Sequence, residues 1–211
     1  GGDDQIPFFR TPDLTTLSNE SEYASTLAGP NNEYLGSSLS GDLLTDNPYG
    51  TPAPVPFLDR FLYVPTLSVG RLVETPDDIV KQAQTFQSFG GRLDPTSAQV
   101  TGYDFLSDGA TGVADALVPT LGVSAVNRLI GDTWTLADLQ NAVAPPTAGV
   151  LSLNAHYDHY RALPADQNAS GNASQLFTSS MLAGSALGGR YAFTMGCHAG
   201  YSVSDIVIGP S

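Results

Sequence analysis

The sequence predicts an α/β fold in which a mostly parallel sheet carries helices on both faces. Two short runs, residues 149–156 and 191–197, have the continuous apolar character of strands that are buried on both sides. From residue 67 onward, strand-like runs of this kind alternate with segments of helical pattern. Because strands separated by helices are joined by right-handed crossovers, we expect them to form one parallel sheet.

The clearest helix lies between Thr75 and Gly90. Thr75 is a suitable N-cap, Pro76 suits the first helical position, and Gly90 follows the last apolar residue. Three apolar positions fall on one face of this helix: Ile79, Ala83 and Phe86.

The other elements of the core follow in order along the chain. We expect a strand at residues 98–103, a helix at about 111–121, a short strand at 127–130 and a helix from Thr135 to about Val143. The strand ending in His156 and the strand ending in Cys197 complete the set, with a short helix near 178–183 between them.

Residues 1–66 differ in composition from this core. They are rich in Pro, Asn, Ser, Thr and Gly, which predicts mostly loop with short helices near 21–28 and 34–44. We expect residues 1–66 to be a loop-rich part of the same domain and residues 67–211 to be its α/β core. The chain begins with Gly1 and ends soon after Cys197, so we expect a segment of a longer protein that is incomplete at both ends.

Composition and charge exclude several classes of partner. Eight basic residues face 21 acidic residues, for a net charge of −13, so we expect no nucleic acid and no anionic lipid surface as partner. No stretch is long and apolar enough to predict a membrane segment. The single cysteine, Cys197, excludes an internal disulfide.

Cys197 and a nearby histidine are the candidate catalytic pair. Two parallel strands that end level with each other would bring the Cys197 thiol and the His156 imidazole to one sheet edge, where a base stabilises the thiolate. His159, three residues later, is the alternative base. The backbone N–H groups of Tyr157 and Cys197 are the expected oxyanion donors.

Two other interpretations remain open at this point. A lone cysteine is commonly a small buried hydrophobe rather than a nucleophile. A zinc site is the second alternative, but catalytic zinc sites usually place two histidines on one helical face, so we expect no metal and no cofactor. That site would draw its ligands from His156, Asp158, His159, Cys197 and His198.

The chain resembles the gingipain-type cysteine peptidases, a family within the caspase-like fold. The shared signature is an apolar strand ending in histidine, then a second strand ending in a small residue and cysteine, here Gly196 and Cys197. His156 and Cys197 are 41 positions apart, and Cys197 opens a Cys-x-x-Gly block. Segments 1–7, 46–50 and 64–71 are also similar to the family. The resemblance implies a caspase-like three-layer sandwich.

The resemblance also implies a function. It predicts a cysteine endopeptidase that acts on protein or peptide substrates, with Asp104 orienting the imidazole and Asp108 receiving an Arg or Lys side chain of the substrate. Either aspartate is equally well explained as a carboxylate at a helix N-terminus. An extracellular or cell-surface location, and a structural calcium ion, are further implications.

One departure from the family pattern supports an alternative function. The family usually has glycine after the catalytic histidine, whereas Tyr157 stands there in this chain. A catalytically inactive caspase-like module, serving as a binding or structural part of a larger surface protein, is therefore the alternative.

Overall fold

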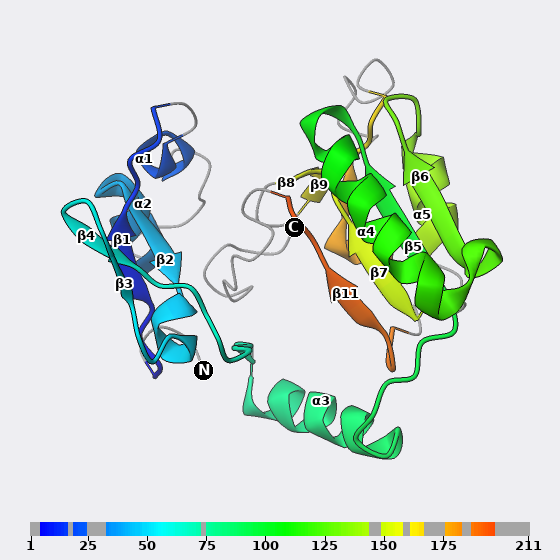
Figure 1. Ribbon diagram of the computed structural model, residues 1–211, viewed down its shortest axis with the longest axis horizontal. Coiled ribbons are helices and arrows are strands. Elements are labelled where there is room, and N and C mark those ends of the chain that lie inside the picture. Colours follow the sequence, from blue (N-terminus) through cyan, green and yellow to red (C-terminus); the bar gives the residue numbers. More distant parts are fainter. Residues whose placement is uncertain are drawn as a thin grey trace. The chain divides into compact units, whose positions relative to one another are not determined.

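The structure is a computed structural model that describes residues 5–16, 19–24, 33–72, 75–143, 149–157, 161–166, 176–182 and 187–196. The chain divides into two compact units, and the boundary falls between Ile79 and Val80 (Figure 1). The change in amino-acid composition at residue 66 therefore lies before the boundary between the two units.

The first unit contains short antiparallel strands that the sequence analysis missed. Strand β1 (Phe9–Pro12) pairs with β2 (Asp42–Thr45), and β3 (Val55–Phe57) pairs with β4 (Arg60–Leu62). Each strand has three or four residues, too few for alternating hydrophobicity to stand out among turn residues. The prediction of mostly loop was therefore incomplete.

The short helices of this unit only partly match the prediction. They are α1 (Glu20–Tyr23), α2 (Glu33–Leu39) and the 3₁₀ helix η2 (Asn47–Gly50). The predicted helix 34–44 stops early because Gly41 adopts φ +72°, and the chain then enters β2 instead.

Helix α3 (Pro76–Ser88) confirms the prediction made from its end signals. The Thr75 hydroxyl donates to Asp78 Oδ2 at 2.6 Å, and the Asp78 N–H donates back to the Thr75 hydroxyl oxygen at 3.3 Å. This reciprocal cap satisfies N–H groups that have no partner within the helix.

The second unit is built on a four-stranded parallel sheet, as predicted. Its spatial order is β11 (Tyr191–Phe193), β7 (Val150–Leu153), β5 (Ala98–Gly102) and β6 (Val126–Ile130), and every neighbouring pair is parallel. The predicted strands near Cys197 and His156 are therefore direct neighbours in one sheet.

Helices cover both faces of this sheet. Helix α4 (Ser107–Leu121) packs over one face through a cluster around Val100, and α5 (Leu136–Val143) packs over the other through a cluster around Leu151 (Figure 1). Successive residues of a strand point to opposite faces, so β6 contributes Val126 and Ile130 to the first cluster and Leu129 to the second. The chain is thus a mixed α/β protein with a central parallel sheet flanked by helices.

Two boundaries in this unit differ from the prediction. Helix α4 begins at Ser107, earlier than predicted, because the 3₁₀ turn η3 (Asp104–Leu106) leads directly into it. Strand β7 ends at Leu153, and His156 lies in a separate strand, β8 (His156–Tyr157). The cause is Asn154, whose side chain bonds to both neighbouring strand ends.

Strand β8 belongs to a second, antiparallel sheet. Its order is β10 (Phe177–Thr178), β9 (Arg161–Leu163) and β8. A 3₁₀ turn, η6 (Ser179–Leu182), follows β10 near the predicted short helix, and another, η4 (Val123–Ala125), precedes β6. Among the described residues, no helix is long and apolar enough to cross a membrane.

Candidate functional site

The carboxyl ends of β5 and β7 meet where the direction of the chain through the sheet reverses. From β5 the chain passes through α4 to β6 on one side, and it then returns through α5 to β7 on the other side of β5. In open α/β sheets, ligands bind outside the carboxyl ends of strands at such a switch point. The residues that directly follow β5 and β7 are therefore the candidate site.

His156 and Asp104 come together at this switch point. Asp104 follows β5 and His156 follows β7, and His156 Nε2 lies 3.5 Å from Asp104 Oδ2. The imidazole is 32% exposed and the carboxylate 63% exposed. A histidine with one nitrogen beside a carboxylate is oriented to use the other nitrogen as a base.

Aromatic rings hold the imidazole in place. The rings of Tyr103 and Phe105 both meet the His156 ring edge to face, at centroid distances of 5.2 and 5.3 Å. The His156 backbone N–H donates to the Tyr103 hydroxyl at 3.1 Å, and that hydroxyl donates to the Leu163 carbonyl oxygen at 3.0 Å. Burial raises the pKa of Tyr103, which favours the neutral phenol in both bonds.

Asp104 has an unusual backbone conformation. Its φ is +52°, a left-handed conformation that costs an ordinary residue roughly 1–2 kcal/mol. Its backbone N–H donates to Asp132 Oδ1 at 2.8 Å. An ordinary hydrogen bond contributes about 0.5–1.5 kcal/mol, which is comparable with this strain.

Asn154 joins three strand ends in the interior. Its amide donates to the Thr101 carbonyl oxygen and to the Ser152 hydroxyl, both at 2.9 Å, while its Oδ1 accepts the Met195 N–H at 3.0 Å. The Asn154 backbone N–H donates to the Thr101 hydroxyl oxygen at 2.9 Å. Because Asn154 is fully buried, this network sets the level at which β5, β7 and β11 end.

Gly196 packs directly against the segment that carries His156. A Cβ at position 196 would overlap the Tyr157 ring and lie 2.7 Å from the Ala155 carbonyl oxygen, so only glycine fits there. The Gly196 N–H donates to the Thr194 hydroxyl oxygen at 2.9 Å. The chain that follows β11 therefore reaches the same site as the chain that follows β7.

The aromatic ring of Tyr157 is the surface on which Gly196 packs. Burial is the main cause that raises the pKa of Tyr157 to about 12, against a smaller opposing effect of its hydrogen bond with the Thr194 side chain. The phenol is thus neutral at ordinary pH and serves as a packing surface for Gly196.

Several residues predicted from the sequence lie outside the described residues. They are Cys197, the alternative base His159, and the additional zinc ligands Asp158 and His198. Of the predicted oxyanion donors, Tyr157 is described and lies in β8 beside Gly196.

Asp108 is exposed in the first turn of α4. Next to it, a Cβ at Gly109 would lie 2.9 Å from Met195 Cε, so the start of α4 contacts the chain that leads toward Cys197. The position suits a helix N-terminal carboxylate as well as a residue that faces a substrate.

Asp132, Asn154 and Tyr103 contribute to the site without having been predicted. The sequence carries only a weak signal for each, namely a polar residue or a tyrosine just after an apolar run. Their partners lie 28 to 60 positions away in the sequence, so only the fold brings them together.

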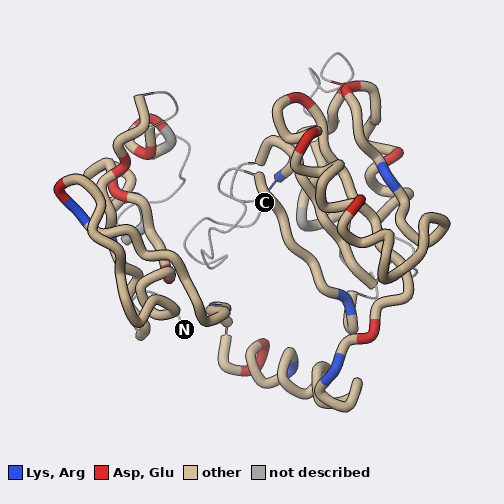
Figure 2. The backbone as a smooth tube through the Cα atoms, in the orientation of Figure 1, with Lys and Arg blue, Asp and Glu red and all other residues tan. Residues whose placement is uncertain are grey.

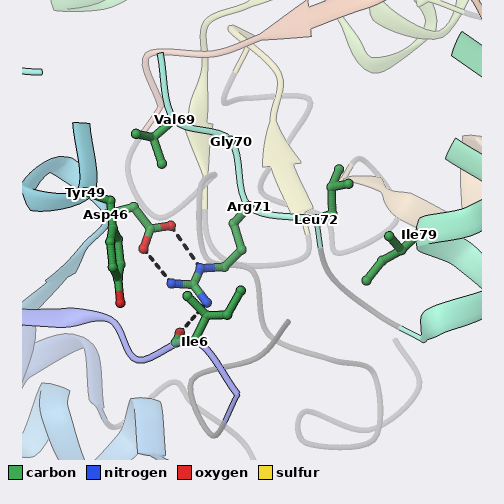
Figure 3. Close-up of a pocket in the computed structure, with 8 residues that line it drawn as sticks. All are labelled: Ile6, Asp46, Tyr49, Val69, Gly70, Arg71, Leu72 and Ile79. Atoms are coloured by element: carbon green, nitrogen blue, oxygen red, sulfur yellow. Dashed lines mark hydrogen bonds and ion pairs between the residues drawn. The ribbon is translucent and has the colours of Figure 1, made fainter. Parts of the chain in front are cut away.

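The first unit contains a cavity of about 420 Å³ whose described lining residues are not those of the candidate site (Figure 3). Arg71 is held there by Asp46 through bonds of 2.5 and 2.9 Å, by the Ile6 carbonyl oxygen at 2.6 Å and by the Phe8 ring at 3.7 Å. The lining residues that the structure describes include no cysteine and no histidine.

No group of three or more metal-ligating side chains occurs within the described ranges. No family model matches the chain, and no curated protein or solved structure matches it either.

Proposed function

We propose that this chain is the catalytic core of a cysteine endopeptidase with the caspase-like fold, in which Cys197 is the nucleophile and His156 the base. The observation that carries the proposal is the pairing of His156 with Asp104 at the switch point of a parallel sheet. Cys197 follows Gly196 directly in the sequence, and Gly196 packs on Tyr157 and Ala155.

The reaction would proceed by acyl transfer. The Cys197 thiolate attacks the peptide carbonyl carbon, and backbone N–H groups of Tyr157 and Cys197 stabilise the oxyanion that forms. The imidazolium of His156 gives its proton to the departing amine, and the neutral ring then accepts a proton from the water that hydrolyses the thioester. Asp104 holds Nε2, which leaves Nδ1 for these transfers.

Substrate preference would follow from acidic groups beside this pair. Asp108 lies one residue from Gly109, which contacts Met195 two positions before Cys197. A carboxylate there would attract an Arg or Lys side chain on the acyl side of the scissile bond.

The experiment measures cleavage and thiol reactivity on the same purified protein. A mixture of fluorogenic peptides with Arg, Lys, Leu or Asp before the reporter should be cleaved at the basic residues. Cys197→Ala should abolish cleavage, and His156→Gln should both abolish cleavage and slow iodoacetamide labelling of Cys197 at neutral pH.

His159→Gln is the matched control because it removes the other histidine of the same segment. If His159→Gln abolishes activity and His156→Gln does not, His159 is the base. Slow labelling in the unaltered protein, unaffected by His156→Gln and with no peptide cleaved, would instead indicate the inactive binding module.

A further inference from the structure

We propose that Asp132 is a positioning residue, which holds the backbone of Asp104 so that the Asp104 carboxylate faces His156. The inference rests on the proposed function, because it concerns the orientation of the proposed base. Asp132 follows β6, whereas Asp104 follows the neighbouring strand β5. It would therefore act across strands, from a part of the chain that the proposed reaction does not otherwise use.

The loop after β6 is itself anchored at the sheet edge. The Gly131 N–H donates to the Gly102 carbonyl oxygen at 2.9 Å, two residues before Asp104. Gly131 has φ +126°, a conformation that favours glycine. The anchored turn presents the Asp132 carboxylate to the Asp104 N–H, which it accepts at 2.8 Å.

This bond acts on Asp104, the one non-glycine residue with a positive φ in the described part of the site. Asp104 has φ +52°, and its side chain is the group that lies 3.5 Å from His156 Nε2. If the peptide N–H loses its acceptor, the backbone is free to return to a right-handed or extended conformation. Rotation about φ would redirect the side chain, and the carboxylate would leave the imidazole.

Water is not an equivalent replacement for the Asp132 carboxylate. The Asp104 side chain is 63% exposed, so a water molecule would readily hydrate its N–H after Asp132 is removed. Water would satisfy the hydrogen bond in any backbone conformation, whereas a side chain fixed to β6 satisfies it only in the observed one. The role of Asp132 is thus to select a conformation.

The test compares two substitutions at position 132. Asp132→Ala removes the acceptor and should lower kcat about tenfold with KM nearly unchanged, which is the size expected from one lost hydrogen bond. Asp132→Asn keeps an acceptor oxygen at the same place and should retain kcat to within about twofold. Asp94→Ala, which removes an exposed carboxylate elsewhere in the unit, is the charge control.

A double-mutant cycle separates positioning from a general effect. In an Asp104→Ala background, Asp132→Ala should cause no further fall in kcat, because the group on which it acts is already absent. Additive losses would overturn the proposal. Equal losses in Asp132→Asn and Asp132→Ala would also overturn it, since they would show that the charge rather than the acceptor matters.

A second measurement does not depend on catalysis. The amide proton of Asp104 should have a downfield NMR shift at neutral pH, which should move upfield in Asp132→Ala and change much less in Asp132→Asn. An Asp104 amide signal unaffected by both substitutions would contradict the inference in a protein of any activity. Absence of peptide cleavage in the unaltered protein would contradict only the proposed function.

Discussion

The partly buried side chain of Tyr157 connects the packing of the site with the pH dependence of stability. Its ring fills the space against Gly196, and burial raises its pKa to about 12 from an ordinary value near 10. Since the unfolded chain releases the phenol proton at lower pH than the folded chain does, unfolding is favoured at alkaline pH.

Tyr157 should therefore make stability fall between about pH 10 and pH 12. Its contribution is complete below pH 10 and is lost as the pH rises through 12, by at most roughly 3 kcal/mol for a shift of this size. Urea unfolding at several alkaline pH values measures the effect. Tyr157→Phe should reduce the slope of stability against pH, whereas Tyr191→Phe, at an exposed ring, should leave that slope as it was.

At the scale of elements, the ends of three parallel strands are joined by one buried side chain. Asn154 makes bonds to β5, to β7 and to the residue two positions after β11. Without the bonds of Asn154, β7 would continue past Leu153 and would include His156. The polar network thus directs the histidine segment into β8.

Loss of the Asn154 amide should be costly because it leaves buried partners unsatisfied. Asn154→Ala should lower the free energy of unfolding by about 2–3 kcal/mol, measured by urea denaturation at neutral pH. Asn127→Ala, at an exposed position of β6, is the control and should change stability by less than about 0.5 kcal/mol. A cost at position 154 no greater than the control's would mean that the network is not fully formed.

At the scale of the whole molecule, the excess of acidic residues creates a field that attracts cationic molecules. The net charge is −13, and acidic residues occur throughout the described parts of both units (Figure 2). Such a field raises the rate at which basic peptides reach the protein, and dissolved salt screens it.

Salt should therefore weaken cleavage of basic peptides more than cleavage of neutral ones. We expect kcat/KM for an Arg-containing cationic peptide to fall at least threefold between about 0.01 M and 0.15 M NaCl, over which the Debye length shrinks from about 30 to 8 Å. A neutral peptide with the same Arg next to the scissile bond is the comparison. Equal salt dependence for both peptides would contradict a long-range effect.

The sequence by itself determined the helices and parallel strands of the central sheet and their order. Cap residues such as Thr75 and Thr135, and continuous apolar runs such as 149–153, act over a few neighbouring residues, so these signals are readable without a fold. The parallel pairing of β7 with β11 followed from the same local pattern together with the crossover rule. The strands of the first unit were not predicted, because alternation of apolar and polar residues cannot be recognised over three or four residues.

The tertiary structure alone decided which side chains meet at the sheet edge. Asp104 with Asp132, Asn154 with Met195, and Gly196 with Tyr157 are contacts between segments far apart in the chain, and no local pattern specifies them. The departure of the chain from β7 at Asn154 was decided in the same way, because the partners of that amide lie on other strands. Local propensity thus sets the elements, and hydrogen bonds between their ends set the geometry around His156.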